Sequence, residues 1–370
     1  MFFLLFIFIS ITLQAILFVC HFFVWKTLVK FLEIKNEKIL RYLKIIFFFL
    51  SITFISTSFI SSVSSNIFAI ILYNFTFYWL SFFYFFIFAS LICHLLLFFG
   101  KKFDYSLNKK IITIFFFSLA VVLAVYGIVN ARDIKVTSIN LKIENIPAEW
   151  KGKKAIFLSD IHLGQIRSTS FANQIVDKIQ AEKPDIVFFG GDLYDGAKAD
   201  LEKVSDPLKR LSPPLGSFYI LGNHEEFDGD EKYVKAAEKV NLRVLNNEKV
   251  DISGVQIVGV DYRQTSERAN FQKVLGDLKI DPAKPSILLK HSPYYVEEAE
   301  KAGVSLQLSG HTHDGQMVPM NFIAKWLFYG FEAGLKKMGK TLIYTSSGAG
   351  TWGPPVRFGT NPEIVLINFK

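Results

Sequence analysis

Hydrophobic positions divide the chain into an apolar N-terminal part and a C-terminal part of short alternating runs. Residues 1–25 carry no charged side chain and are long enough to cross a bilayer as a helix. They lack the basic start and the cleavage site of a secretory signal, so we expect a retained span. Residues 45–100 are uncharged over two span lengths, with the polar connection SSVSSN at 61–66, and residues 111–130 form a fourth apolar segment. The pattern predicts an all-α transmembrane region of about four helices in residues 1–130.

Beyond residue 130 the chain repeats a short apolar run followed by a polar or glycine-rich turn. Near-continuous apolar strands that alternate with helices are typical of an α/β structure whose sheets are covered on their faces. We expect helices at 169–182 and 231–240, and a first strand from the alternation IKVTSINLKIE in a linker at 131–150. The remaining predicted strands are KAIFL, DIVFF, SFYIL, VQIVGV, SILLK, SLQL, TLIYT and EIVLI. Together they predict an α/β domain at 151–370.

The distribution of charge indicates how the chain is placed in a membrane. Residues 1–130 hold 10 Lys/Arg and 3 Asp/Glu, whereas residues 131–370 hold 31 and 30. The basic residues of the first part crowd two connections, 26–44 and 101–110, and the connection between them has none. The positive-inside rule makes both cytoplasmic, which predicts a multi-pass cell-membrane protein with its C-terminal domain on the extracytoplasmic side. The near-neutral C-terminal part has no basic stripe, which argues against a nucleic-acid partner.

Few side chains inside the spans could take part in chemistry. Transporters place ionisable or helix-breaking residues there, and these spans offer His21, His94 and scattered Ser, Thr and Asn. An anchor is therefore favoured over a transporter, and both histidines are interpreted as span-end or packed polar residues. Both cysteines, Cys20 and Cys93, also lie in the apolar part, so the domain at 151–370 has neither a disulfide framework nor a thiolate metal site.

Potential ligands follow the predicted strands, where sites gather in α/β folds. An Asp-x-His pair on an extended segment turns both side chains to the same side, and the pair His-x-His follows the same logic. A carboxylate can bridge two cations, and an asparagine offers a neutral oxygen next to a histidine that points the other way. The residues in these positions are Asp160, His162, Asp192, Asn223, His224, His291, His311 and His313. Singly, each has an ordinary alternative as a helix cap, a turn residue or a packed histidine.

The five turns, in this order, resemble the motifs of the calcineurin-like metallophosphoesterase superfamily: D-x-H, G-D, G-N-H-[DE], a lone H and G-H-x-H. The resemblance extends from about residue 153 to the C-terminus, and the ending PPVRFGTNPEIVLI after a membrane region looks like the bacterial membrane-associated branch. It implies a two-sheet sandwich flanked by helices at 151–370. It also implies two divalent metal ions, for which the imidazole and oxygen ligands suit Mn, Fe, Co or Zn better than calcium.

Residue roles follow from the same resemblance. One metal would be held by Asp160, His162 and His313, the other by Asn223, His291 and His311, with Asp192 as the bridge. His224 would contact substrate and protonate the leaving group, and Asp195 in GDLYDG stands where the phosphatases have the aspartate that orients this histidine. Asp314 departs from the family, which often has glycine there. A carboxylate at this position could repel an anionic substrate, reach an outer hydrogen bond or point into water.

These roles predict a membrane-anchored, metal-dependent phosphoric ester hydrolase that works by attack of a metal-bridged hydroxide. A phosphodiester or a lipid-linked pyrophosphate is the favoured substrate. Two other interpretations stay open: a catalytically silent relative that binds or assembles, and a transporter with a soluble accessory domain. The aromatic and basic segment at 317–338 either lies at the bilayer surface or forms an internal helix packed on the sheet.

Overall fold

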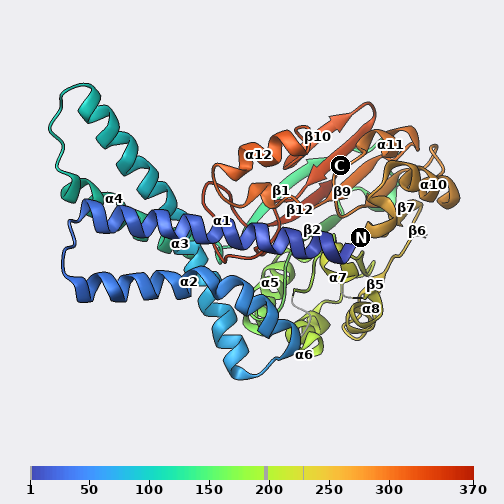
Figure 1. The fold of residues 1–370 in the computed structure, drawn as a ribbon. Helices are drawn as coiled ribbons and strands as arrows, with labels where there is room; N and C mark the ends of the chain where they lie inside the picture. The colour runs from blue at the N-terminus through green and yellow to red at the C-terminus, as the bar shows by residue number, and fades with distance from the viewer. Residues whose placement is uncertain (1, 196–198, 228) are drawn as a thin grey trace. The chain divides into compact units, whose positions relative to one another are not determined.

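The computed structural model describes residues 2–195, 199–227 and 229–370; Met1, the first residue of the first predicted span, lies outside the described residues. The chain divides into two compact units (Figure 1). Unit 1 comprises Met1–Val129 with Gly353–Pro355, and unit 2 comprises Asn130–Trp352 with Val356–Lys370. Each unit is described by itself below.

Unit 1 consists of long apolar helices, and the prediction of about four is confirmed. They are α1 (Phe2–Phe31), α2 (Glu37–Val63), α3 (Ile67–Lys102) and α4 (Lys109–Asn130). By length and composition, all four could span a membrane. Asn36 and Asn66 accept hydrogen bonds from the first turns of α2 and α3, which satisfies backbone donors that a helix start leaves free. The connection between α2 and α3 falls at the end of the predicted SSVSSN segment.

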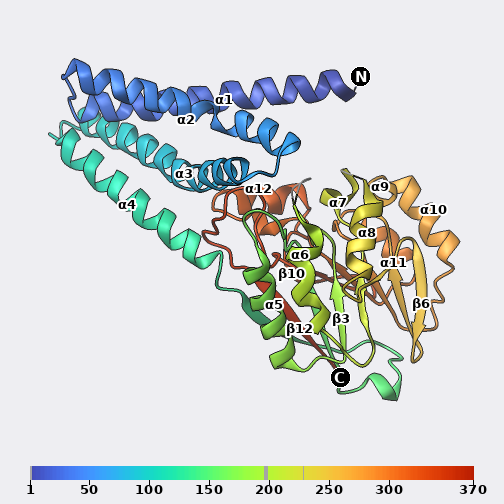
Figure 2. The same ribbon diagram turned by 90° about the horizontal axis from the view of Figure 1, so that it is seen from below.

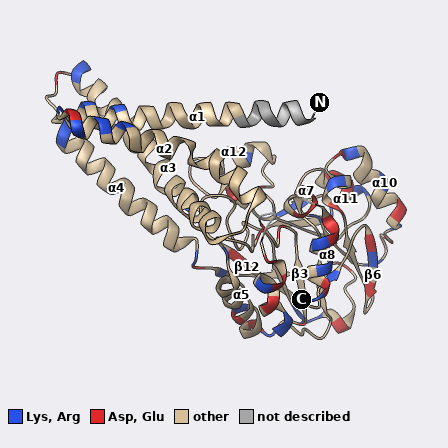
Figure 3. Cartoon of the chain, turned by 60° about the horizontal axis from the view of Figure 1, so that its bottom comes forward, with Lys and Arg blue, Asp and Glu red and all other residues tan. Residues whose placement is uncertain are grey.

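The two basic connections of unit 1 meet at one end of its helices. Glu33, after α1, bonds to Lys109 and Lys110 at the start of α4, at 2.9 and 2.7 Å. Figure 3 shows the charged residues of unit 1 gathered at this end, with uncharged helix shafts beyond it. The first and third connections therefore lie on the same side of any membrane that the helices cross.

Several polar side chains inside unit 1 bond to one another across the helices. His21 is buried; its Nδ1 bonds to the Leu17 carbonyl, and its Nε2 accepts from Trp79 Nε1 at 3.0 Å. His94 Nε2 lies 3.2 Å from Thr27 Oγ1. Both histidines are thus packed polar contacts between helices, as the sequence suggested.

Unit 2 contains two six-stranded mixed sheets. The first has the order β1 (Lys135–Leu141), β12 (Glu363–Phe369), β2 (Lys154–Leu158), β3 (Ile186–Phe189), β4 (Ser217–Tyr219), β5 (Arg243–Val244). The second has the order β10 (Gly334–Met338), β11 (Thr341–Thr345), β9 (Leu306–Ser309), β8 (Ser286–Leu289), β7 (Val255–Gly259), β6 (Glu248–Ile252). Strands β2 to β5 run parallel, as do β7, β8, β9 and β11. All the predicted strands are present.

Helices cover the outer faces of the two sheets, which confirms the predicted sandwich. The other elements of unit 2 are α5 (Thr169–Glu182), α6 (Leu201–Ser205), α7 (Asn223–Phe227), α8 (Asp230–Glu238), α9 (Tyr262–Thr265), α10 (Arg268–Leu278), α11 (Val296–Lys301), α12 (Met320–Leu327) and the 3-10 turns at Ala148–Trp150, Asp206–Arg210 and His313–Gly315. Helices α5 and α10 lie on opposite sides of unit 2 (Figure 2).

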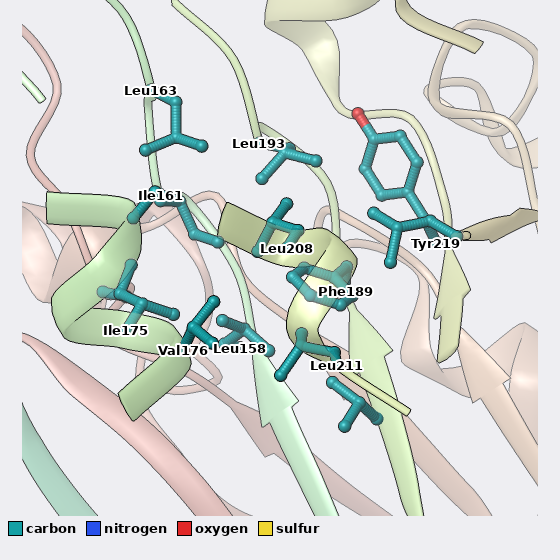
Figure 4. Packing of buried hydrophobic residues seen from close by; sticks show 14 of the residues in the cluster. Leu158, Ile161, Leu163, Ile175, Val176, Phe189, Leu193, Leu208, Leu211 and Tyr219 are labelled. Atoms are coloured by element: carbon teal, nitrogen blue, oxygen red, sulfur yellow. The ribbon is translucent and has the colours of Figure 1, made fainter. Parts of the chain in front are cut away.

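The alternation of side chains along buried strands builds two of the cores. In β2, Ala155 and Phe157 pack between the sheets with residues of β7, β8 and β9. Ile156 and Leu158 face the other way, against α5. Figure 4 shows Val176 of α5 beside Leu158 in this outer core. A strand buried on both faces needs a continuous apolar run, which is why the eight runs were recognisable in the sequence.

Candidate metal centre

The candidate ligands lie in loops at the carboxyl ends of parallel strands from both sheets. The first sheet contributes the loops after β2, β3 and β4, and the second contributes those after β8 and β9. The structure brings all eight candidate side chains to this one edge, together with Asp195. Three groups of His and Asp have ligand atoms within 4.8 Å of one another: Asp160, His162 and His313; His162, Asp192 and His224; and Asp192, His291 and His311.

The backbone conformation at the candidate ligands differs from the extended conformation that we expected from the sequence. The sequence argument placed Asp160 and His162 on an extended segment, and this was wrong, because both residues have a left-handed backbone with φ of 54° and 55°. Asp192, His311 and His313 also have positive φ. This conformation costs on the order of 1–3 kcal/mol at a non-glycine residue and concentrates at functional sites. Hydrogen bonds such as Asp160 N–H to the Gly191 carbonyl (3.0 Å) hold the loops in place.

The first group is closely packed. His162 Nε2 lies 3.1 Å from His313 Nε2, which in turn lies 3.5 Å from Asp160 Oδ1. All three residues are buried. Burial lowers the pKa of His162 to about 4 and holds the pKa of His313 well below its ordinary value. Both imidazoles are therefore neutral and have lone pairs to offer a cation.

The group of Asp192, His291 and His311 is arranged around the His291 ring. Its Nε2 lies 3.2 Å from Asp192 Oδ2 and 3.2 Å from Asn223 Oδ1. Its Nδ1 donates to the Gly190 carbonyl at 2.8 Å, which fixes the ring with Nε2 toward the cluster. This outer hydrogen bond is the usual arrangement for a metal-binding histidine. Burial also lowers the pKa of His311 to about 3.

Asp192 lies between the group that contains His162 and His313 and the group that contains His291 and His311. Its Oδ2 is 3.2 Å from His291 Nε2 and 4.0 Å from His162 Nε2. Its Oδ1 accepts from the His224 N–H at the start of α7, while its Oδ2 faces the histidines. The alternative of a helix N-cap at Asp192 is wrong, because residues 192–195 form a loop. A Cβ at Gly222 would collide with Asp192 Oδ1, so glycine is required for this close approach.

The residues present fit a pair of divalent cations. The set combines buried imidazoles, two buried aspartates and one amide oxygen, without thiolates, which suits Mn, Fe, Co or Zn. Burial raises the pKa of Asp160 to about 6, and His291 offsets this rise only in part. Burial lowers the pKa of His291, but Asp192 outweighs it and raises the value to about 9. A protonated His291 would thus supply, beside Asp192, the positive charge that a cation would otherwise supply.

His224 and Asp195 form a pair at the rim of the cluster. His224 Nδ1 lies 3.2 Å from Asp195 Oδ1, and the His224 side chain is 21% exposed. Burial opposes its protonation, but the hydrogen bond to Asp195 and the charge of Asp192 raise the pKa of His224 to about 9. A carboxylate on Nδ1 leaves Nε2 as the nitrogen that can donate a proton outward.

Two buried charged residues at the site were given no role from the sequence. The Glu225 carboxylate accepts from the backbone N–H groups of Asp192, Tyr194 and Gly222 at 3.1, 2.9 and 2.7 Å, and so ties the loop after β3 to the loop after β4. In the sequence, Glu225 could have been noticed as the acidic position of the G-N-H-[DE] motif. Arg357 is fully buried and donates to the carbonyls of Gly350 and His313. An arginine in PPVRFG gives no sign of burial.

Asp314 belongs to none of the three candidate metal-ligand groups. It follows His313 in a 3-10 turn with φ of 49°, and its N–H bonds to Thr312 Oγ1. Burial and then Glu332 raise its pKa to about 6. The carboxylate therefore interacts electrostatically with Glu332 and does not complete the ligand cluster.

Comparison with known proteins gives consistent matches. A family model described as calcineurin-like phosphoesterase matches residues 153–315. An uncharacterized metallophosphoesterase of Campylobacter jejuni is 35% identical over 279 residues, 73% of each chain. Another from Aquifex aeolicus is 33% identical and covers 68% of this chain and 98% of its own. A transmembrane protein with metallophosphoesterase domain from Danio rerio is 31% identical, covering 68% of this chain and 61% of its own.

Among solved structures, GAP50, the anchor in the inner membrane complex of Plasmodium, is 13% identical to this chain. The match covers 58% of this chain and 79% of GAP50, with a TM-score of 0.37.

Proposed function

The chain belongs to the calcineurin-like metallophosphoesterase family, and from that premise we propose that it is a membrane-anchored, metal-dependent phosphoester hydrolase. The observation that supports this most is the position of Asp192, whose Oδ2 lies within 4.0 Å of nitrogens from both histidine groups. In this proposal residues 1–130 are the anchor, 131–150 the linker with the first strand, and 151–370 the catalytic domain.

The ligand assignment follows the two groups. Asp160, His162 and His313 would hold one divalent cation and Asn223, His291 and His311 the other, with Asp192 shared. When bound, the two cations would polarise the phosphoryl group and lower the pKa of water enough for it to act as a nucleophile near neutral pH. Mn, Fe and Zn are the cations we favour.

His224 supplies the acid. With Nδ1 engaged by Asp195, its Nε2 carries a proton at neutral pH and can deliver it to the leaving oxygen. Such general acid catalysis is typically worth about 100-fold to 10,000-fold in rate. The contribution is greatest for alkyl leaving groups, which supports a phosphodiester as substrate. The other favoured substrate, a lipid-linked pyrophosphate, would release a phosphate group and would depend less on this proton.

Glu225 acts through other groups. By holding the N–H groups of Asp192 and Gly222, it sets the distance between the bridging carboxylate and the loop that carries Asn223 and His224. Glu225 is therefore a positioning residue, which makes no contact with the reacting atoms itself.

The orientation in the membrane is also part of the proposal. Both lysine-rich connections lie at one end of the helices, as the Glu33 ion pairs require, and a basic end faces the cytoplasm. Helix α4 starts at this cytoplasmic end and crosses the membrane once, so the catalytic domain that follows it lies on the extracytoplasmic side. Labelling of a cysteine introduced at Lys273 by an impermeant reagent in intact cells checks this orientation.

A direct experiment separates hydrolysis from silent binding. The full chain, purified and loaded with Mn, is assayed on alkyl and nitrophenyl phosphodiesters while its metal content is measured. We expect two metal ions per chain and hydrolysis that Asp192→Asn abolishes. Two bound metal ions without hydrolysis of any ester would instead favour a binding or assembly protein.

A further inference from the structure

Helix α12 and the turn after it present large apolar side chains to solvent. Phe322, Trp326 and Tyr329 are 66%, 76% and 83% exposed, and Ala324 is the buried residue of the helix. The interpretation of this segment as a helix packed on the sheet by its apolar face is therefore wrong. We call these exposed residues the α12 surface: Met320, Phe322, Ile323, Trp326, Leu327 and Tyr329. A contiguous apolar surface of this kind marks a contact with a partner or a membrane.

The composition of the α12 surface suits a lipid headgroup region. Tryptophan and tyrosine are the residues that gather where a bilayer meets water. Lys325 accompanies them in the helix, whereas Glu332, the one acidic residue of 317–338, is buried. Basic groups next to interfacial aromatic residues attract anionic headgroups. The chain also has four helices that could span a membrane, so a bilayer is available to the surface.

The same helix is fastened to the metal-binding turn. Phe328, which caps the C-terminus of α12, packs edge-on against the His311 ring at 6.0 Å between centroids and lies 4.9 Å from the Tyr294 ring. Thr312, between the two histidines of the last motif, donates to the Glu332 carbonyl at 2.5 Å. The depth at which α12 rests in a membrane therefore fixes the distance of the candidate metal centre from the headgroups.

We propose that the α12 surface lies in the headgroup region of a lipid bilayer and that the site takes its phosphoester from a lipid headgroup. The second clause rests on the proposed hydrolase function; the first does not. In the reaction, water oxygen bonds to phosphorus as the P–O bond to the leaving oxygen breaks. His224 Nε2 gives its proton to the leaving oxygen, and the proton of the water passes to solvent.

The membrane contact is tested on the full chain in lipid nanodiscs of phosphatidylcholine and phosphatidylglycerol. Cys20→Ala and Cys93→Ala give a background in which Trp326→Cys carries an environment-sensitive fluorophore. The matched control is Lys273→Cys, at an exposed position of α10. We expect a blue-shifted emission at 326 that spin-labelled lipid quenches and iodide does not, and the reverse at 273. Quenching of position 326 by iodide alone overturns the proposal, as does protection from both quenchers, which would mean that protein covers the surface.

The substrate clause is tested with Phe322→Glu/Trp326→Glu, using Lys273→Glu as the matched charge control. The readout is the ratio of the rate on a phosphodiester lipid in the nanodisc to the rate on a soluble nitrophenyl diester. We expect the double substitution to lower this ratio about tenfold and the control to leave it unchanged, since inserted apolar area sets the strength of interfacial binding. An unchanged ratio overturns the clause. If the unsubstituted protein hydrolyses neither ester, the hydrolase function itself fails, while the fluorophore at 326 still decides the membrane contact.

Discussion

Several buried polar side chains of unit 1 form isolated pairs across the helices, whereas those at the strand ends of unit 2 are crowded together. Thr57 and Thr76 share a hydrogen bond of 2.7 Å, and His21 accepts from Trp79. Such pairs need no explanation beyond helix packing. In contrast, the carboxylates of Asp160, Asp192 and Glu225 are buried together among histidines.

The contrast between the two units indicates that function lies at the strand ends of unit 2. Burying one carboxylate next to another is unfavourable unless positive charge compensates it. A buried cluster of carboxylates therefore indicates a functional site. The helices, by contrast, bury no charged side chain among the residues whose burial the structure describes.

Substituting the shared carboxylate should have the largest effect. Asp192→Asn keeps the shape but removes the charge that faces both histidine groups, so we expect loss of bound metal and of measurable turnover. Metal analysis of the purified protein and phosphodiester hydrolysis check this. The matched control is Asp206→Asn, which changes an exposed aspartate of the same domain. Full activity of the Asp192 variant would show that the crowded carboxylates are structural only.

Substitution of His224, the proposed general acid, should have the second-largest effect on hydrolysis. His224→Ala is expected to keep both metal ions and to slow hydrolysis of an alkyl phosphodiester by about 100-fold to 10,000-fold. A nitrophenyl diester, whose leaving group needs no proton, should be hydrolysed at nearly the original rate. Equal effects on the two esters would remove His224 from proton donation.

Loss of the positioning carboxylate should have an intermediate effect. Glu225→Gln replaces an acceptor of three backbone N–H groups by an amide, and we expect metal affinity to fall about 10-fold to 100-fold. Thermal unfolding should show a loss of about 1–3 kcal/mol. Glu202→Gln on the surface is the control. Unchanged metal titration would mean that the three hydrogen bonds do not set the site.

The smallest effect is expected in unit 1. His21→Leu leaves the Trp79 N–H without its acceptor, which should cost about 0.6–1.7 kcal/mol in helix association. Hydrolysis of a soluble ester should not change. A loss of hydrolysis comparable to that of His224→Ala would give the helices a catalytic role and end the contrast between the two regions.

The sequence predicted eight strands from their apolar runs because those strands are buried on both faces. It also predicted β1, an edge strand with one side exposed, from the alternation IKVTSINLKIE. Three others, β5, β6 and β10, were not predicted, since they alternate with charged residues such as Arg243, Glu248 and Lys336 at the edges of their sheets. Pattern recognition depends on burial, and an edge strand lacks it on one side.

The candidate ligands were predictable because each follows a recognisable strand, but their supports were not. Nothing local distinguishes Arg357 from a surface arginine or reveals that Glu225 is enclosed. The left-handed turns at Asp160 and His162 were also hidden, because long-range hydrogen bonds to the loop after β3 stabilise them. Likewise, α12 has a helical pattern, but only tertiary structure shows that its apolar side faces outward.

Each of the two ligand groups draws on both sheets: Asp160 and His162 follow β2, whereas His313 follows β9, and Asn223 follows β4, whereas His291 follows β8. A cation bound by either group would therefore link loops of the two sheets to each other. Chelation should loosen this edge first, so the heat resistance of the domain would rise and fall with the metal supply of its surroundings.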